Sequence, residues 1–546
     1  MKQRITVFAF LLLGASFLMA SGVYEIARVT KVGNIDTGVG EGAARTVAYS
    51  RKHRSLCIAN TARVALDIVS IADPARPGVA DLRSVDLSEY GGSTSGVAIS
   101  GELIAVSVQD EECTAPGRVI FIDFRGRILR SLEVGSAPVM LVFTPDGTKL
   151  IVANEGIPSE DYTLDPEGSV SIIDVSEGAG PASVRHVGFT EFNRRKYDLT
   201  GKGVRIFGPN ATVAQDLEPA CIAVSEDSLT AWVTLQENNA IAELDIAAAR
   251  FTKIFPLGFK DHRGNEGGMD ASDKDGRIDI RGRPVFGMYQ PDGVAAFSEG
   301  DEIYLITANE GRSREYTSFN EAARVQQLAL DPSAFPRPEG LKSPGSLGRL
   351  KVTTTLGDYD GDGDYDALFS FGGRSFSIWK PGERAMELIY DSGSDFERIT
   401  AKSHPASFNC SAGLNARFDE RSDESGTAPD SVAVGYWLGQ RYAFVGLQNG
   451  LGGVMIYNIT DPAHPFFVRY IVSNDGSGRR GNDISSKSVT YIHTLHAPEP
   501  YPLLAVAYGR TGNVALYRLA GKEQERRPQA AGAPSAGGGG RRSPGQ

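Results

Sequence analysis

Five aspartates occupy alternate positions in the short stretch DYDGDGDYD: Asp358, Asp360, Asp362, Asp364 and Asp366. Neither lysine nor arginine stands among them, so the like charges need another partner. Oxygen ligands at alternate positions around a tight glycine turn suit a hard cation, because the backbone can curl and bring the carboxylates to one point. Phe369 stands where an EF-hand loop carries its glutamate, so the stretch is not a helix-loop-helix calcium hand. The spacing predicts a Ca²⁺ site that orders the loop, with a solvated acidic loop as the alternative.

A second acidic run, DASDKDGRID, holds four further aspartates: Asp270, Asp273, Asp275 and Asp279. Lys274 and Arg277 lie within this run and offset part of its charge. The run is therefore compatible both with a second, weaker metal site and with a solvated loop.

Motifs for nucleophilic or zinc-dependent catalysis do not occur in the sequence. The seven histidines are scattered, and neither HExxH nor GxSxG is present. No two cysteines form a CxxC pair, which argues against a zinc site and against a c-type haem. The four cysteines leave open both disulfides in an oxidising compartment and buried free thiols.

The elements that must position these side chains are short β-strands. Runs of valine, isoleucine, leucine and phenylalanine are bounded by glycine, proline, aspartate and asparagine, which indicates an all-β fold. The runs recur as seven strand-turn-strand-strand units, whose second strands end at 57–60, 106–109, 151–154, 233–236, 306–309, 445–448 and 505–508. Repeated small β-meanders predict a seven-bladed β-propeller, because each blade buries its faces only against its neighbours. A β-sandwich, the main alternative, would not explain the repeat.

Amide side chains close the second strand in six of the seven units: Asn60, Gln109, Asn154, Gln236, Asn309 and Gln448. Acidic residues follow four of them: Asp110, Glu155, Glu237 and Glu310. Equivalent positions of a propeller form a ring on one face, so we expect a polar pocket or cation site there, made by Asn154, Glu155, Glu237, Asn309, Glu310, Arg312 and Arg314. The alternative is that the amides cap turns by bonding nearby backbone.

The propeller is expected to span 23–520, with long loop insertions at about 248–290 and 312–368. The first insertion contains the weaker acidic run, and the second contains the alternating aspartates. Long insertions on a rigid scaffold are where function usually lies. The early segment 24–32 is expected to pair beside 513–519, which would close the ring and protect both edges.

The two ends of the sequence indicate export. Lys2 and Arg4 precede an apolar run over 5–19 and small residues at 20–22, which predicts a signal peptide over 1–22; an uncleaved anchor is the alternative. The tail 521–546 is rich in glycine, proline and arginine and is expected to be disordered, without a transmembrane anchor. The net charge of -11 argues against nucleic acid as a partner. We expect a secreted, periplasmic or cell-surface protein.

Several long motifs in order resemble the choice-of-anchor I family, including GFKDHRGNEGGMDASDKDG, YLITANEGRSREY, LGDYDGDGDYDALFSFGGRSFSIW and YAFVGLQNGLGGVMIYNITDPAHPFFVRY. The likeness covers about 25–520. The family is similar to YVTN-type propellers and includes bacterial surface proteins and mesenchyme-specific cell surface glycoproteins of animals. The resemblance implies an exported or surface protein. Some relatives are labelled alkaline phosphatase.

Two functions follow from these observations. The first is an exported calcium-binding propeller that acts as an extracellular or cell-surface binding or adhesion module for a glycan or protein ligand. The second is a metal-dependent hydrolase, similar to a phosphoesterase, with its site at the propeller mouth. Arg312 and Arg314 are the nearest cations for an anionic substrate, although we expect them to pair with Glu310 and Glu315 instead.

Overall fold

The computed structural model describes residues 26–412, 416–472 and 483–521. The predicted signal peptide (1–22) and, apart from Gly521, the predicted disordered tail lie outside these residues. The described part of the chain forms seven four-stranded sheets and one five-stranded sheet. This composition confirms the predicted all-β class.

Each four-stranded sheet is an antiparallel meander, called here a blade. Blades 1 to 4 follow the chain without interruption. Blade 1 is β2 (Thr46–Ser50), β3 (Ser55–Asn60), β4 (Ala65–Ser70) and β5 (Arg83–Asp86), and blade 2 is β6 (Ser93–Ser100), β7 (Leu103–Gln109), β8 (Pro116–Ile122) and β9 (Ile128–Ser136). Blade 3 is β10 (Pro138–Phe143), β11 (Lys149–Asn154), β12 (Ser169–Asp174) and β13 (Ser183–Gly188), and blade 4 is β14 (Pro219–Val224), β15 (Thr230–Leu235), β16 (Ala240–Asp245) and β17 (Arg250–Pro256).

The remaining blades include one interrupted by an insertion and one completed by the start of the chain. Blade 5 is β20 (Val294–Glu299), β21 (Glu302–Asn309), β25 (Ser375–Pro381) and β26 (Met386–Asp391). Blade 6 is β27 (Pro429–Trp437), β28 (Gln440–Leu447), β29 (Val454–Asn458) and β30 (Phe466–Ile471). Blade 7 is β31 (Ser486–Ile492), β32 (Leu503–Tyr508), β33 (Asn513–Gly521) and β1 (Ile26–Asp36).

The first strands of the blades contact one another in cyclic order: β2, β6, β10, β14, β20, β27, β31 and again β2. The blades therefore form a closed ring, which confirms the β-propeller. Apolar side chains fill the space between neighbouring blades; Leu66 of blade 1 and Val106 of blade 2, for example, belong to one cluster and are completely buried. Such stacking explains why the apolar runs recur, since one blade alone would expose its faces.

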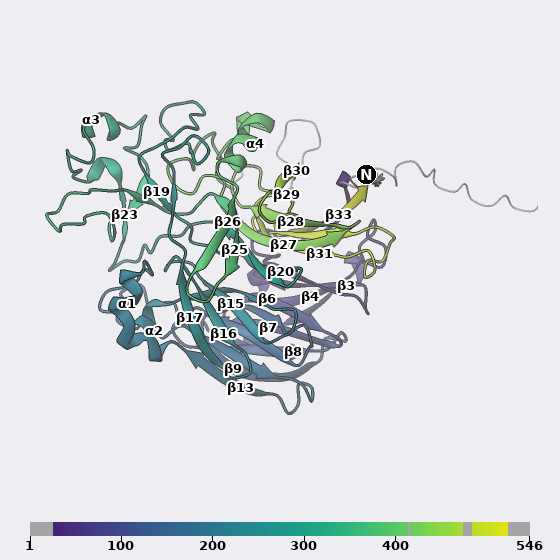
Figure 1. Cartoon of the computed structure of the whole chain (residues 1–546). Helices are drawn as coiled ribbons and strands as arrows, with labels where there is room; N and C mark the ends of the chain where they lie inside the picture. Colours follow the sequence, from purple (N-terminus) through teal and green to yellow (C-terminus); the bar gives the residue numbers. More distant parts are fainter. Residues whose placement is uncertain (1–25, 413–415, 473–482, 522–546) are drawn as a thin grey trace, which may run out of the picture.

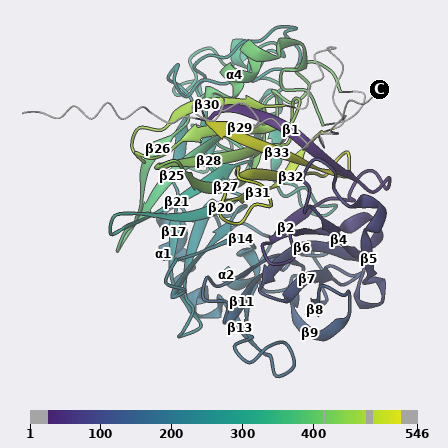
Figure 2. The same ribbon diagram turned by 90° about the vertical axis from the view of Figure 1, so that its right-hand side faces the viewer.

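The ring is closed by a strand from the beginning of the chain. β1 pairs antiparallel with β33, for example Val29 with Leu519 and Ile35 with Val514. Figure 2 shows the purple β1 beside the yellow β33. The predicted closure is confirmed for the residues that the structure describes, and β1 is the outer strand of blade 7.

Two excursions from the ring pair with each other in the five-stranded sheet, called here the insertion sheet. Its order is β18 (Phe259–Asp261), β19 (Phe286–Met288), β24 (Phe369–Ser370), β23 (Lys351–Thr353) and β22 (Ala322–Arg324). In Figure 1, β19, β23 and α3 (Pro338–Leu341) lie together at the upper left, to one side of the blades. Buried Met269, Val285, Leu347 and Val352 form a core of their own there.

The bounds of both insertions differ from the expectation. Residues 250–256 are β17, the outer strand of blade 4, so the first excursion starts after Pro256 instead of near 248. The second continues to β25 at Ser375, beyond the expected end at 368. The sequence pattern did not locate the ends of the insertions, because the strands of the insertion sheet are only two or three residues long.

Two further connections were not anticipated as structural units. The link between β13 and β14 contains α1 (Lys196–Gly201) and α2 (Val213–Asp216), and the link between β26 and β27 contains α4 (Asp395–Ser403). Both connections carry acidic residues of the candidate sites, Glu218 in the first and Asp419 in the second.

Cys57, Cys113 and Cys221 carry free thiols.

Candidate functional site

A cavity of about 430 Å³ opens where the first strands of the blades begin and the second strands end. We call it the mouth pocket, and every blade contributes to its lining, including Thr46, Ser95, Glu155, Cys221, Glu310, Asp430 and Lys487. The ring of strand ends inferred from the sequence therefore does surround a polar pocket.

The asparagines at these strand ends stabilise their own blades. Asn154 Nδ2 donates to Ser171 Oγ (2.9 Å), and Asn309 Nδ2 donates to Ser377 Oγ (2.7 Å). Both asparagines are completely buried and do not belong to the lining of the mouth pocket. The expectation that they form the pocket is corrected, because their short side chains bond sideways to the next strand of the same blade.

Gln236 and Gln448 are one methylene longer and reach the acidic residues of the pocket. Gln236 Nε2 donates to Glu310 Oε2 (3.0 Å), and Gln448 Nε2 donates to both Glu310 and Asp430, the latter at 2.7 Å. The amides of blades 4 and 6 thus hold the carboxylate of blade 5 from both sides.

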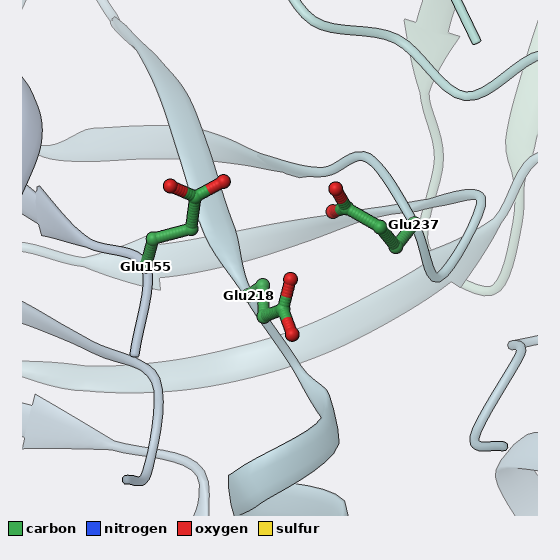
Figure 3. Close-up of side chains that lie close together, drawn as sticks. All are labelled: Glu155, Glu218 and Glu237. Atoms are coloured by element: carbon green, nitrogen blue, oxygen red, sulfur yellow. The ribbon is translucent and has the colours of Figure 1, made fainter. Parts of the chain in front are cut away.

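Three glutamates gather at one side of the mouth pocket, and we call them the glutamate group: Glu155, Glu218 and Glu237. One carboxylate oxygen of each lies within 4.8 Å of those of the other two. Figure 3 shows the carboxylate of Glu237 directed toward that of Glu155, with the carboxylate of Glu218 below them. All three side chains are buried.

The sequence placed Glu155 and Glu237 together but missed Glu218. Glu155 follows β11 and Glu237 comes two residues after β15, as the repeat predicted, whereas Glu218 directly precedes β14. A signal was available, since Glu218 adjoins the proline that begins the first strand of its blade, and Asp292 and Asp430 adjoin prolines at the corresponding place.

Arg312 is the partly exposed cation of the glutamate group. Its Nη1 lies 3.1 Å from Glu155 Oε1, and its Nε lies 3.4 Å from Glu237 Oε1. The Arg312 side chain is 51% exposed, whereas the two glutamates are buried. A ligand entering the pocket would therefore meet this guanidinium.

Arg314 has a structural role instead. It is 3% exposed, forms an ion pair with Asp216, and places Nη2 2.8 Å from Glu218 Oε1. The expected pairing of Arg312 and Arg314 with Glu310 and Glu315 is wrong, because the chain turns after Gly311 and directs the arginines toward blades 3 and 4. Arg314 does not line the mouth pocket.

Burial dominates the electrostatics of the glutamate group. It raises the pKa values of Glu155 and Glu218 above the ordinary range, although the nearby guanidinium groups oppose the shift. Glu237 Oε2 is buried and accepts no hydrogen bond from any described residue. One buried carboxylate oxygen of the group therefore receives no hydrogen bond from the two arginines.

A second group of carboxylates lies in the same pocket, and we call it the aspartate-rich group: Asp292, Glu310 and Asp430. Their oxygens also lie within 4.8 Å of one another. The cation closest to them is Lys487, whose Nζ is 3.0 Å from Asp430 Oδ1. Burial, followed by repulsion from Asp430, raises the pKa values of Asp292 and Glu310. Cys221 Sγ lies 3.5 Å from Asp292 Oδ1.

The alternating aspartates form a loop that joins β23 to β24 in the insertion sheet. Oxygens of Asp358, Asp360 and Asp366 lie within 4.8 Å of one another. Asp358 accepts hydrogen bonds from the backbone N–H groups of Gly361 (2.7 Å) and Gly363 (3.1 Å), which curl the chain around it. Both glycines have positive φ, 79° and 96°, a conformation that favours glycine.

Asp362 and Asp364 do not belong to this three-carboxylate group. Asp362 Oδ1 accepts from the backbone N–H of Asp364 (3.0 Å). Slight desolvation and repulsion from Asp362 raise the pKa of Asp364. The structure thus brings three of the five predicted ligands together.

The aspartates of the second acidic run do not gather as one set; they bond to different partners. Asp273 pairs with Arg349 (2.9 Å), and Asp279 pairs with Arg283 (3.1 Å). Asp270 is buried and accepts from the backbone N–H of Asp279 (2.6 Å). Asp275 Oδ2 lies 3.6 Å from Arg277 Nε. Arginines thus pair with Asp273 and Asp279, whereas Asp270 has backbone donors.

Comparison with known proteins identifies a family match over most of the chain and relatives of parts of it. The choice-of-anchor I domain matches residues 45–462. Gigasin-3a of Magallana gigas is 32% identical over 189 residues, which cover 32% of this chain and 65% of that protein. The mesenchyme-specific cell surface glycoprotein of Strongylocentrotus purpuratus is 28% identical over 283 residues, covering 46% of this chain and 36% of that protein. The chain therefore spans less than two thirds of either relative.

Two solved structures resemble the fold at low sequence identity. Hydrazine synthase of Kuenenia stuttgartiensis gives a TM-score of 0.45 at 12% identity, covering 88% of this chain and 96% of that one. The β-propeller domain of Cps50 (Swd1) from Myceliophteria thermophila gives a TM-score of 0.41 at 10% identity, covering 91% of this chain and 100% of that one.

Within the described ranges, no helix is both long enough and apolar enough to cross a membrane.

Proposed function

Because the chain belongs to the choice-of-anchor I family, we propose that it is an exported or cell-surface propeller whose mouth pocket binds an extracellular glycan or protein ligand. The resemblance to a protein named as a cell surface glycoprotein supports the location. The observation that carries the binding role is the arrangement of Asp292, Glu310 and Asp430 in one open cavity with Lys487 as their nearest cation. Clustered carboxylates in excess of their cationic partners, here the buried Asp430 with the partly buried Asp292 and Glu310, attract a cation.

The aspartate-rich group would hold a divalent cation, for which Ca²⁺ is the best candidate. Ca²⁺ takes six to eight oxygen ligands in a flexible geometry, so three carboxylates leave positions for ligand oxygens. Vicinal hydroxyls of a glycan, or a carboxylate of a protein ligand, would supply these oxygens. The partly exposed Arg312, together with Arg45 in the lining, would then bond to the anionic or polar remainder of the ligand.

The Asp358 loop would carry a separate structural Ca²⁺ ion. Asp358, Asp360 and Asp366 supply converging carboxylates, and the loop lies in the insertion sheet instead of the mouth pocket. A cation there would neutralise the charge and order the loop, without taking part in ligand binding.

The test is Ca²⁺-dependent binding to a panel of immobilised glycans and extracellular matrix proteins, with and without chelator. We expect Glu310→Gln and Asp430→Asn to abolish binding while circular dichroism stays unchanged. Glu226→Gln, which alters an exposed acidic residue outside the pocket, is the matched control. Binding that survives both pocket substitutions and chelation would refute the proposal.

A metal-dependent phosphoesterase is the second candidate, and one observation favours it. Arg45, Arg312 and Lys487 line the same cavity as the aspartate-rich group. A metal ion held by that group would therefore lie next to cationic side chains that can bind phosphate. Arginine suits phosphate because its planar donors match two phosphate oxygens. A screen of phosphate mono- and diesters with Ca²⁺, Mn²⁺ and Zn²⁺ tests this reading. Hydrolysis by the parent protein that is lost in Asp292→Asn would establish an enzyme. A metal-loaded protein that hydrolyses none of these esters would support the binding role instead.

A further inference from the structure

A second set of acidic side chains lies outside the mouth pocket, where the first insertion meets the connection from β26 to β27. We call it the junction cluster: Asp270, Asp275, Asn409 and Asp419. Asp270, Asn409 and Asp419 are at most 2% exposed, and the side chain of Asp275 is 6% exposed. The cluster therefore places three carboxyl groups and an amide in the interior.

Hydrogen bonds fix two of these residues next to each other. The backbone N–H of Asp419 donates to Phe408 O (2.9 Å), and that of Arg421 donates to Asn409 O (2.8 Å), so the two chain segments lie side by side. Ser422 joins their side chains, because its hydroxyl donates to Asp419 Oδ1 and accepts from Asn409 Nδ2 (2.9 Å).

Glu397 of α4 links this pair to the first insertion. Its carboxylate accepts from the backbone N–H of Asp270 (2.9 Å) and from Asn409 Nδ2 (3.3 Å). Arg374 Nη1 lies 2.8 Å from the same carboxylate, and the remaining contacts of Arg374 are to backbone carbonyls, one of them Asp270 O. The buried guanidinium thus neutralises Glu397, whereas Asp270 and Asp419 form no ion pair with any described residue.

Three oxygens of the cluster accept no hydrogen bond from the part of the chain that the structure describes: Asp275 Oδ2, Asn409 Oδ1 and Asp419 Oδ2. All three are also shielded from solvent. Asp275 Oδ2 lies 3.6 Å from Arg277 Nε, but the Arg277 side chain is 64% exposed. A buried oxygen without a donor is unfavourable by about 1–3 kcal/mol, and by more when it is charged. The carboxyls of Asp270, Asp275 and Asp419 are near enough to repel one another, so the unpartnered oxygens indicate a missing partner.

We propose that Asp270, Asp275, Asn409 and Asp419 bind a divalent cation, and that this cation is Ca²⁺. All the available donors are oxygens, with neither histidine nor cysteine in the set, which favours a hard cation over Zn²⁺ or Cu²⁺. The amide oxygen of Asn409 suits Ca²⁺, which accepts neutral oxygen ligands beside carboxylates. Backbone carbonyls and water would complete the six to eight ligands.

This site differs from the weaker metal site inferred from the sequence. Asp270 and Asp275 remain in it, but Asp273 and Asp279 are replaced by Asn409 and Asp419, which lie more than a hundred positions later. The cation would therefore fasten the first insertion to the segment that leads into blade 6. That role is structural and does not depend on the proposed function of the mouth pocket.

Protons are the competing explanation. Burial, together with repulsion between these carboxyls, raises the pKa of Asp270 to about 7 and that of Asp419 to about 8. Without a cation, Asp419 would thus be mostly protonated and Asp270 partly protonated near neutral pH. Asp419→Asn distinguishes the two explanations. Asparagine imitates the protonated acid, so it would preserve a site held by protons, whereas it would weaken a metal site.

The experiment uses the full chain with the other candidate sites removed by Asp358→Asn, Asp360→Asn and Asp430→Asn. Ca²⁺ binding is measured by titration calorimetry, and the melting temperature is measured in Ca²⁺ and in chelator. We expect one ion to remain and to raise the melting temperature. Adding Asp419→Asn should remove this ion and its thermal shift, while the chelated protein keeps its folded circular dichroism and does not melt earlier.

Glu266→Gln, at an exposed position of the same insertion, is the control and should leave the remaining ion in place. Asp275→Asn is the second variant and should weaken binding at least tenfold. The proposal is overturned if the background protein binds no Ca²⁺, or if Asp419→Asn and Asp275→Asn retain the stoichiometry and thermal shift of the background.

Discussion

Arg312 Nη1 lies 3.1 Å from Oε1 of Glu155, although 157 positions separate the two residues. The contact joins the first residues after β21 to the residue that follows β11, so it links blade 5 to blade 3 across the mouth pocket. Replacing Arg312 by methionine leaves Glu155 and Glu237 without this guanidinium. Since the glutamates are buried and the arginine is half exposed, we expect a loss of about 1–3 kcal/mol in unfolding free energy, measured by urea denaturation. Glu155→Gln in the Arg312→Met background should recover part of it; no loss at all would contradict a neutralising role.

The buried ion pairs of Arg314 should matter more than any surface pair. Arg314 and its partners Asp216 and Glu218 are all at most 3% exposed. Arg314→Met leaves two carboxylates uncompensated in the interior, for which we expect about 3–5 kcal/mol of destabilisation by chemical denaturation. Lys380→Ala removes an exposed pair with Glu302 and should change stability by less than ~1 kcal/mol. Equal effects of the two substitutions would show that burial does not set the size of the effect.

Calcium should protect the Asp358 loop from proteolysis. Asp358, Asp360 and Asp366 converge, whereas Asp364 lies outside their group. We expect Ca²⁺ to slow cleavage in the loop, Asp358→Asn to remove the protection, and Asp364→Asn to keep it. The cleavage site is identified by mass spectrometry of the fragments. Equal protection in both variants would mean that the loop has no such ion.

The insertion sheet should loosen in acid because of His262, which precedes β19 and follows β18. Burial, together with Lys260, lowers the pKa of His262 to about 3 from the ordinary 6.5, so the folded protein holds a neutral imidazole. Nδ1 lies 2.6 Å from Gly267 O, and Nε2 is buried with no hydrogen-bond partner among the described residues. The unfolded chain binds the proton at higher pH, so the stability contributed by the neutral ring is lost as pH falls from 6.5 toward 3.

Hydrogen exchange between pH 4 and pH 7, corrected for intrinsic rates, measures this effect at β18 and β19. Protection should fall with pH in the parent protein and stay nearly constant in His262→Gln, whose amide can still donate to Gly267 O. The blades serve as an internal control, and a uniform loss of protection over the whole chain would contradict a local cause.

Removing the closing strand should destabilise the propeller. Ile35 is 1% exposed and packs with Leu516 and Ile58 between blades 7 and 1. Ile35→Ala should cost about 2–5 kcal/mol in thermal or chemical unfolding, and deletion of 24–32 should lower the melting temperature further. A truncated chain that is as stable as the parent would show that β1 does not close the ring.

The sequence predicted the ring well and the site incompletely, for one physical reason. Blades repeat, so Glu155, Glu237 and Glu310 were placed by analogy between equivalent strands. Asp292, Asp430 and Glu218 lie at the opposite ends of such strands, and their approach depends on the closure of the ring. Asn409 and Asp419 lie in a connection without any repeat, so only the fold brings them to Asp270.

Assignments of ion pairs failed where the sequence offered a close neighbour. Glu310 and Glu315 flank the two arginines, and proximity along the chain favoured them. The structure pairs Arg312 and Arg314 instead with carboxylates of blades 3 and 4, which are buried and gain more from a guanidinium than the exposed Glu315 would. Local charge patterns are therefore a poor guide wherever a long insertion leaves the ring.

Pairing between β1 and β33 also constrains when the protein can become stable. A ribosome makes β1 first and β33 last, so the strand that closes blade 7 has no partner until synthesis is almost complete. Contacts this distant in sequence slow folding, and until they form, both edges of the open arc can pair with other chains. A product that ends before Asn513 therefore lacks β33, which leaves β1 and β32 with unpaired edges.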